Sequence, residues 1–415
     1  MTKSSFLIFI ISFCFGTSAT AQTWEVITNV TNKNLNSVHF PSEQVGYAVG
    51  DDGTLLKTTD GGSLWTNLSN NLNISKDIHS LFFTSENIGF IVGYETFYRT
   101  IDGGATWIKV TDGIGDCIFT SVHFISPQIG FATASLWTGK GIYKTTNGGI
   151  TWSKKTIPDT GDRLLRSIHF VNNSVGYAVG HGSNSGGVVL RTENGGETWV
   201  EQNFANTGID ISSVLILPSV YFVNEQLGFI VGSDYWANGV YYNVIFKTTD
   251  GGQSWESNLY VTNQHVSNVY FVNEHIGYIA GEFAGILKTT DSGENWSKVQ
   301  IPGYSWANSL WFRNEDNGVI VGYGGKIAIA SPSDKTGLEE SSSLSIKIYP
   351  NPIINNFFIE SQSTINVIKI YNQLGSLVFE KNDFNSEKVQ LDLSGFKSGL
   401  YVIEINDWKQ TIIKK

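Results

Sequence analysis

Three short sequence elements recur along most of the chain, and they constrain its fold more than any other feature. The element T-x-D/N-x-G-x-x-W occurs six times, and G-Y/F-x-V/A-G or a near relative occurs seven times. An apolar run that ends in Phe also occurs seven times. Repeats of this kind indicate structural units that bury their faces against neighbouring copies. Read as four strands each, A to D, they predict an all-β fold with a seven-bladed β-propeller over residues 22–330.

The two ends of the repeat region complement each other. Thr23–Val26 is similar to the start of strand D in other repeats, such as Thr106–Lys109, whereas the last repeat, Asn308–Ala330, has no strand D. We expect the N-terminal strand at Trp24 to pair with residues 326–330 and to complete the last blade. Such closure removes a free sheet edge, which would otherwise promote aggregation.

The element T-x-D/N-x-G-x-x-W resembles the Asp-box of bacterial neuraminidase repeats. Its acid or amide can accept hydrogen bonds from N–H groups of its own turn, its Gly permits a positive φ, and its Trp packs the C–D hairpin against the blade. A residue repeated six times serves the repeated fold more often than a site. We therefore predict a structural role for Asp60, Asp102, Asn147, Asn194, Asp250 and Asp291.

Loop lengths distinguish the two faces of the propeller. The step from the strand A Phe to the strand B Gly is always 6 residues, and the step from the box acid or amide to its Trp is always 5. By contrast, the step from the strand B Gly to the box varies from 13 to 22, and from Trp to the next strand A Phe from 16 to 23. Because variable loops on a rigid scaffold carry function, we predict the binding surface on the side of the B–C and D–A loops.

These loops combine aromatic and polar residues, which suit a sugar ring or a protein partner. The alternative is that some of the aromatic side chains pack against their own loops. The candidate ligand-binding residues are Trp137, His181, Asp234, Tyr235, Trp236, Tyr241, Tyr242, Tyr304 and Trp306.

The sequence predicts neither a metal site nor a cofactor. His39, His123 and His169 share one position of strand A, where other repeats have Phe, Tyr or Trp, so we interpret it as a packing position. Cys117 is the only cysteine after residue 21, where we place the end of a signal peptide below. A single cysteine forms neither an internal disulfide nor a zinc site. The net charge of −10, without a basic tract, argues against nucleic acid as a partner.

Two classes of enzyme contain Asp-box propellers. Sialidases have six blades and bind the substrate carboxylate with three arginines, but here Arg99 and Arg191 occupy the strand C position just before the box. Xyloglucan-degrading glycoside hydrolases face two propellers across a cleft, with one catalytic Asp from each, whereas this chain has one propeller. We therefore assign no catalytic residue, and a glycoside hydrolase of the xyloglucanase type stays as the alternative.

Repeats such as G-Y-A-V-G-D-D-G-T-L-L-K-T-T-D-G-G-S-L-W, at residues 46–65, resemble the photosystem II assembly and stability factor family. The resemblance extends from about Trp24 to Ala330. It implies a single seven-bladed propeller without known catalysis that acts as a scaffold in membrane-protein assembly. We predict a non-catalytic binding or assembly module with a protein or glycan ligand, without the photosynthetic role, because the C-terminal domain indicates another kind of cell.

After Ala330 the repeat stops, and residues 331–345, rich in Ser, Pro, Lys and Glu, have the composition of a linker. Seven short strand-like runs in residues 346–415 predict a small Ig-like β-sandwich. Its motifs are Y-P-N-P at 349–352, I-Y-N-Q-L-G at 370–375 and L-S-G-F-K-S-G-L-Y at 393–401.

Together these motifs resemble the type A C-terminal sorting domain of the type IX secretion system. The resemblance implies a Bacteroidota-type cell, contacts with the secretion machinery and its sortase, and passage across the outer membrane. An ordinary carbohydrate-binding sandwich is the alternative.

The N-terminus has the pattern of a signal peptide over residues 1–21. Lys3 precedes an apolar run at 6–15, and Ala19-Thr20-Ala21 forms a cleavage signal. The apolar run is too short to span a bilayer as a helix. We therefore expect a protein without a transmembrane segment that reaches the cell surface or the medium by way of the periplasm.

Overall fold

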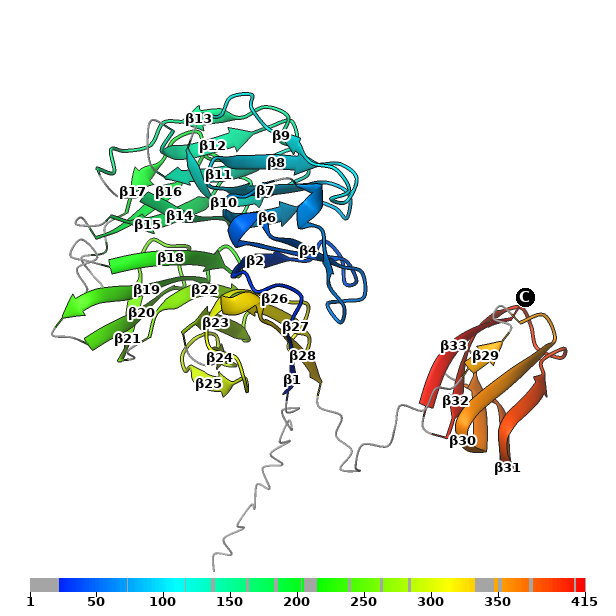
Figure 1. Cartoon of the computed structure of the whole chain (residues 1–415). Helices are drawn as coiled ribbons and strands as arrows, with labels where there is room; N and C mark the ends of the chain where they lie inside the picture. The colour runs from blue at the N-terminus through cyan, green and yellow to red at the C-terminus, as the bar shows by residue number, and fades with distance from the viewer. Residues whose placement is uncertain are drawn as a thin grey trace, which may run out of the picture. The chain divides into compact units, whose positions relative to one another are not determined.

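The computed structural model describes residues 22–72, 74–115, 117–135, 139–161, 164–182, 186–202, 204, 215–237, 240–261, 264–282, 285–332, 347–349, 353–372, 376–406 and 408–414. The predicted signal peptide and most of the predicted linker lie outside these ranges. The chain divides into two compact units, Met1–Ser333 and Asp334–Lys415 (Figure 1), and each is described by itself.

The first unit consists, over its described residues, of seven antiparallel sheets of four strands each. The first three blades are β2 (Leu35–His39), β3 (Gly46–Gly50), β4 (Leu55–Thr58) and β5 (Thr66–Asn67); β6 (Ile78–Phe83), β7 (Gly89–Gly93), β8 (Thr96–Thr100) and β9 (Ile108–Lys109); and β10 (Ile118–Phe124), β11 (Gly130–Ser135), β12 (Gly141–Thr145) and β13 (Ser153–Lys155). The next three are β14 (Leu164–Phe170), β15 (Gly176–His181), β16 (Gly187–Thr192) and β17 (Val200–Glu201); β18 (Leu215–Phe222), β19 (Gly228–Ala237), β20 (Val240–Thr248) and β21 (Glu256–Val261); and β22 (Val266–Phe271), β23 (Gly277–Gly281), β24 (Gly285–Thr289) and β25 (Ser297–Gln300).

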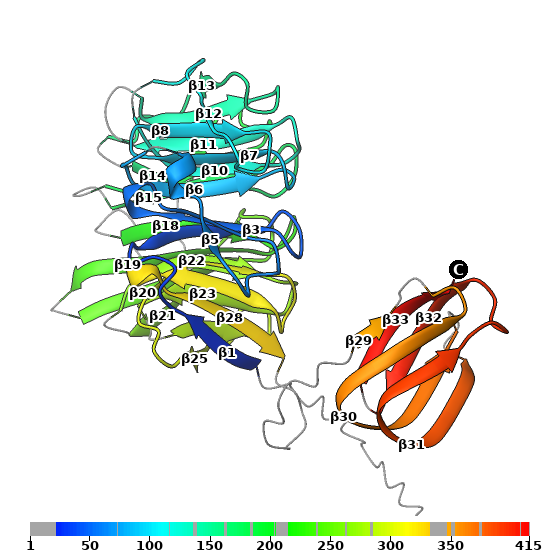
Figure 2. The ribbon, with the colours of Figure 1, turned by 45° about the vertical axis from the view of Figure 1, so that its right-hand side comes forward.

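The seventh blade joins both ends of the propeller. It consists of β26 (Ala307–Phe312), β27 (Gly318–Gly322), β28 (Ile327–Pro332) and the N-terminal β1 (Gln22–Ile27), in the order β1-β28-β27-β26. Trp24 pairs with Ala330, as the sequence predicts, although β28 extends two residues beyond the expected strand. The first strands of neighbouring blades contact one another in a closed ring, because β26 contacts β2. Figure 2 shows β1 beside β28. The prediction of an all-β, seven-bladed propeller is thus confirmed.

Strand B of each blade lies in the core between neighbouring sheets. Every residue of β3, β7 and β27 is buried. The glycine that begins each strand B lies under the Phe that ends strand A, and a Cβ on Gly46 would be 2.4 Å from the ring of Phe40. Only glycine permits this close approach, which accounts for the constant spacing of the two residues.

The second unit differs from the expected seven short strands. Its described residues form five, namely β29 (Lys347–Tyr349), β30 (Asn356–Tyr371), β31 (Leu377–Asp392), β32 (Gly399–Ile405) and β33 (Trp408–Lys414). The chain stays extended between the runs predicted at 357–360 and 367–371, so both belong to β30, which changes register with β31 between Glu360 and Ile365. Consequently the first half of β30 pairs with β29 and its second half with β32, around one apolar core.

Among the described residues, no helix has the length and apolar character needed to cross a membrane. The helical segments of the described ranges are short 3₁₀ turns, at Asp51–Gly53, Ser69–Asn71 and Tyr323–Gly325.

Candidate functional site

The junctions between consecutive blades follow one pattern. The aromatic second residue of strand B stacks on the strand A Phe of the next blade, with ring centroids 3.8 to 4.4 Å apart. In blades 1 to 6 these pairs are Tyr47–Phe83, Phe90–Phe124, Phe131–Phe170, Tyr177–Phe222, Phe229–Phe271 and Tyr278–Phe312.

A basic residue of strand C completes each of these six junctions. It pairs across the sheet with the strand B ring, as Lys57 does with Tyr47. The ammonium nitrogen of Lys57 lies 5.2 Å from the centre of the Tyr47 ring and donates to the carbonyl oxygen of Gly103, in the next blade's box, at 2.9 Å. The Tyr47 hydroxyl donates to the same oxygen, also at 2.9 Å. The ring and the cation together fill the space beside the next Asp-box.

The Asp-box itself is held by hydrogen bonds within its turn. Asp102 Oδ1 accepts from the hydroxyl of Thr100 at 2.8 Å and from the N–H of Thr106 at 2.9 Å, and Oδ2 accepts from the Thr106 hydroxyl at 2.6 Å. These bonds, that of the Thr106 hydroxyl first, lower the pKa of Asp102 to about 2. Asn147 makes the same Oδ1 bonds, and its amide nitrogen donates to Thr151. An amide therefore serves as well as a carboxylate at this position.

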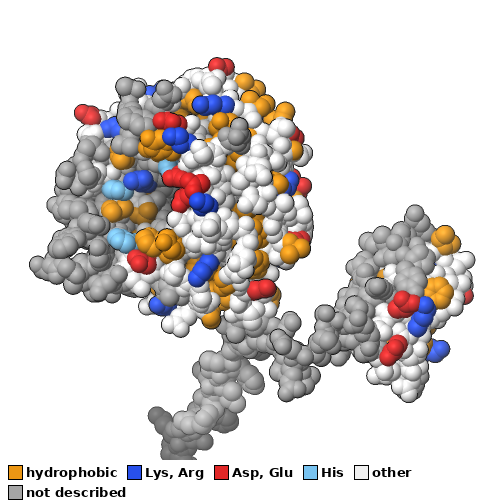
Figure 3. Space-filling view, viewed as in Figure 1, with side chains coloured by type: hydrophobic (Ala, Val, Ile, Leu, Met, Phe, Trp, Pro, Cys, Tyr) orange, Lys and Arg blue, Asp and Glu red, His pale blue; other side chains and the backbone are white. Residues whose placement is uncertain are grey.

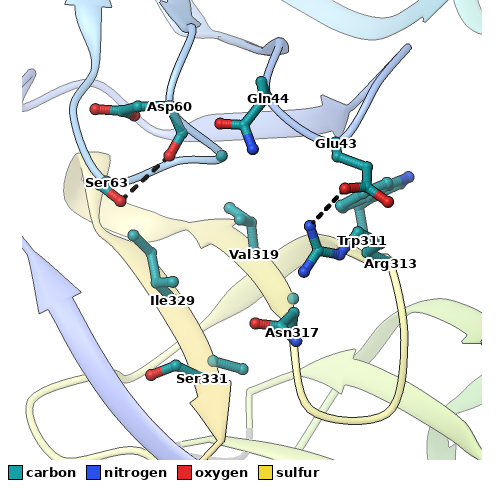
Figure 4. Close-up of a pocket in the computed structure, with 13 residues that line it drawn as sticks. Glu43, Gln44, Asp60, Ser63, Trp311, Arg313, Asn317, Val319, Ile329 and Ser331 are labelled. Atoms are coloured by element: carbon teal, nitrogen blue, oxygen red, sulfur yellow. Dashed lines mark hydrogen bonds and ion pairs between the residues drawn. The ribbon is translucent and has the colours of Figure 1, made fainter. Parts of the chain in front are cut away.

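The junction between blade 7 and blade 1 departs from the pattern. Val319 has the place of the strand B ring and Ile329 the place of the strand C cation, since these two residues pair across the sheet as Tyr47 and Lys57 do. Phe40, lacking a strand B ring to stack on, stacks instead on Trp311 with centroids 4.5 Å apart. The smaller side chains leave a pocket of about 240 Å³ between the two blades (Figure 4).

The pocket has a mixed surface, to which polar atoms contribute somewhat more than apolar ones. Val319, Ile329 and Trp311 contribute apolar surface, and Figure 4 shows Val319 and Ile329 below the turn that carries Asp60. At the rim, Arg313 donates to a carboxylate oxygen of Glu43 at 3.1 Å. This pocket was not predicted from the sequence. The signal was available, because Val and Ile interrupt an otherwise regular series of aromatic and basic residues.

The candidate residues of the B–C and D–A loops are only partly described. Trp137 lies outside the described residues. Asp234, Tyr235, Trp236, Tyr241 and Tyr242 lie on β19 and β20, where Asp234 pairs with Tyr242, but the description of these five covers the backbone alone.

His181 ends β15 and is half-buried. Burial first, and then the positive charge of Arg166, lowers its pKa to about 4. Its Nδ1 is covered and has no hydrogen-bond partner among the residues that the structure describes. His181 is therefore an uncharged imidazole at neutral pH.

The two candidates of the last D–A loop have different environments. Tyr304 is only 3% exposed, and its hydroxyl donates to the carbonyl oxygen of Lys326 at 3.3 Å. Its ring packs inside the blade, so Tyr304 does not supply the exposed aromatic surface for which it was chosen. Trp306 is half-buried and stacks on His265 of the preceding D–A loop, with centroids 6.2 Å apart. In Figure 3, histidine side chains lie among hydrophobic, basic and acidic ones on the face drawn.

The three strand A histidines lie in a series of aromatic contacts. The ring centroids of His123 and His169 are 5.1 Å apart, and His169 is 4.8 Å from Tyr221. Each of the three histidines is partly exposed to solvent. Burial nevertheless lowers the pKa of His39 and of His169 to about 4. Within the described ranges no three His, Cys, Asp or Glu side chains are grouped to hold a metal ion.

Comparisons with known proteins find matches to segments of both units. Residues 17–111 and 200–304 match the family described as photosynthesis system II assembly factor YCF48, and residues 347–415 match the secretion system C-terminal sorting domain. A photosystem II assembly lipoprotein Ycf48 from Synechococcus sp. (strain CC9902) is 26% identical over 148 residues, 35% of this chain. The match spans 43% of that relative, less than half its length.

Solved structures share the fold. Ycf48 bound to a D1 peptide is similar with a TM-score of 0.59 at 19% identity, over 75% of this chain and 97% of that one. A xyloglucanase from Xanthomonas campestris has the same TM-score at 12% identity, over 83% of this chain and 60% of that enzyme. The chain therefore has the fold of an Asp-box β-propeller with segments similar to the Ycf48 family, followed at residues 347–415 by a match to the secretion system C-terminal sorting domain.

Proposed function

We propose that the propeller is a non-catalytic module that binds a protein partner outside the cell, with the sorting domain directing its export. The observation that carries the proposal is the match of two long segments to the assembly-factor family. A solved relative of that family holds a D1 peptide, which supports a polypeptide as the ligand here.

The side of the B–C and D–A loops is our proposed contact surface. Trp306 offers a partly exposed indole above His265, and aromatic side chains with adjacent polar groups are typical of contact residues that contribute strongly to binding. Because Asp-box turns of constant length fix the opposite side, sequence variation in the loops can change the partner without changing the scaffold.

The experiment measures peptide binding by the exported chain with a displayed peptide library, in parallel with binding and hydrolysis of xyloglucan. We expect peptide ligands whose affinity falls at least tenfold in Trp306→Ala. The matched control is Ile150→Ala, which removes an exposed apolar side chain from a C–D turn on the other side and should leave affinity unchanged. Release of reducing ends from xyloglucan, without peptide binding, would support the hydrolase alternative.

A further inference from the structure

The pocket between blades 7 and 1 corresponds to a space that the protein itself fills at the six other junctions. At five of these junctions an aromatic ring and a basic side chain from the preceding blade lie beside the Asp-box of the next one, and the sixth leads to blade 7, whose repeat has no Asp-box. Val319 and Ile329 are smaller than Tyr47 and Lys57, and neither carries a hydrogen-bond donor. We propose that this pocket binds the phenol ring of a tyrosine on a partner protein, taking the place that Tyr47 has at the first junction.

The acceptor that such a hydroxyl needs is already in position. Gly61 is the equivalent of Gly103, because each follows the box Asp and donates its N–H to the A–B turn of its own blade. The carbonyl oxygen of Gly103 accepts from both Tyr47 and Lys57. Since valine and isoleucine have no donor, the blade 7 side chains at these two positions give Gly61 no equivalent bond, and a tyrosine hydroxyl can supply one.

The Asp-box of blade 1 also departs from the repeat, and this departure places another hydrogen-bond acceptor at the same pocket. In the other boxes the residue four positions after the acid or amide carries a hydroxyl or amide that bonds to it, as Thr106 does to Asp102 Oδ2. In blade 1 this residue is Leu64, which is 76% exposed and can donate only its backbone N–H, to Asp60 Oδ1. Asp60 lines the pocket, and its hydrogen bonds, that of the Leu64 N–H first, lower its pKa. An ionised acceptor beside the apolar side chains of Val319 and Ile329 favours a ring that carries a donor.

The rest of the pocket matches an aromatic ring and not an isolated ion. Trp311 presents an indole, and offset or edge-on contact between aromatic rings is favourable. Arg313 and Glu43 at the rim neutralise each other, so neither sign of charge is selected there. The turns that form the pocket lie on the side opposite the loops. The site is therefore independent of the surface proposed above, and it adds a second contact to the same binding function.

The test uses the full exported chain with N-acetyltyrosinamide and N-acetylphenylalaninamide, observed by saturation-transfer NMR titration. We expect the tyrosine probe to bind about three- to tenfold more tightly than the phenylalanine probe, because one net hydrogen bond separates them. Val319→Tyr restores the repeat and fills the pocket. The variant should bind the tyrosine probe at least tenfold more weakly than the wild type, without a lower melting temperature. Ile150→Tyr, which adds a tyrosine to an exposed turn, is the control and should leave probe binding unchanged.

A second variant covers the case in which Val319→Tyr does not fold. Leu64→Thr gives Asp60 the hydroxyl partner that other boxes have, and it should reduce the preference for tyrosine over phenylalanine without changing the core. Equal binding of both probes to the wild type and both variants, or no binding to the wild type, overturns the proposal. Binding that appears only after residues 333–345 are replaced by a Gly-Ser sequence also overturns it, because the chain's own linker then occupies the pocket. Trp306→Ala should leave probe binding unchanged, which separates failure here from failure of the loop surface.

Discussion

The indole of Trp24 meets the ring of Phe312 edge-on, with centroids 6.2 Å apart and planes at 78°. The two residues come from opposite ends of the propeller sequence, yet their geometry repeats that of Phe40 and Trp65 within blade 1, at 6.0 Å and 88°. Strand β1 thus supplies the seventh copy of an aromatic pair that every other blade makes from its own repeat. The contact also joins β1, at the N-terminal end of the propeller, to the rest of the last blade.

Trp24→Ala should destabilise the whole propeller. Trp24 is half-buried, so we expect roughly half of the about 3–5 kcal/mol that truncation of a fully buried Trp costs. Urea unfolding followed by circular dichroism measures the change. Glu25→Ala, at an exposed position of the same strand, is the control. If β1 detaches while the urea midpoint of the whole propeller stays unchanged, the pairing of β1 with β28 does not stabilise the closed ring of blades.

The Asp-box should tolerate an amide but not a methyl group. Asp102→Asn keeps the oxygen that accepts from Thr100 and the Thr106 N–H, whereas Asp102→Ala removes it. We expect a lower melting temperature for the alanine variant and little change for the asparagine variant, as Asn147 and Asn194 suggest. Equal melting temperatures for both variants would contradict a structural role for the box.

The strand A histidines should make stability depend on pH. The pKa of His169 is about 4 in the folded chain and about 6.5 when unfolded, so the unfolded state binds more protons between these values. The stability that depends on the neutral imidazole of His169 is fully present above pH 6.5 and is lost as the pH falls toward 4. His169→Tyr, which copies Tyr221, should reduce the drop in melting temperature between pH 7.5 and 5. His275→Gln, at an exposed turn, should leave that drop unchanged.

Deletion of residues 346–415 should block export and leave the propeller folded. The two units are separately compact, and the deleted residues include the whole match to the sorting domain. Cell fractionation and surface protease treatment measure the outcome, with the truncated protein expected in the periplasm. Its appearance on the surface would argue against the sorting role.

Trp152 and Trp236 should respond differently to truncation. Trp152 is 4% exposed and contacts Phe90, Phe97 and Phe124, so Trp152→Ala should cost about 3–5 kcal/mol of stability. Trp236 lies near the end of β19, in the longest connection between strands B and C, and we expect Trp236→Ala to cost little stability and to weaken partner binding. If Trp236→Ala destabilises the fold as much and leaves binding intact, its side chain packs the loop.

The sequence alone determined the architecture, because each blade is specified by local spacings. The strand A Phe and the strand B Gly are always six residues apart since the ring of Phe40 lies where a Cβ of Gly46 would be. The partner of the N-terminal strand at Trp24, which is β28, was likewise predictable, because only the last repeat lacks a strand D. Such signals are readable since they lie within one repeat, or in the one repeat that is incomplete.

Tertiary structure decided what depends on contacts between distant segments. Tyr304 and Trp306 are two residues apart in one loop, yet only the packing of blade 7 makes the first a core residue and leaves the second half-buried. The seven runs of the C-terminal domain became five strands because the chain stays extended where β30 changes register. The pocket beside Val319 exists because ring closure brings it against Gly61 and Gln44, from the far end of the propeller sequence. The smaller side chains of Val319 and Ile329 form a pocket only because the packing of blade 1 against blade 7 supplies its other wall.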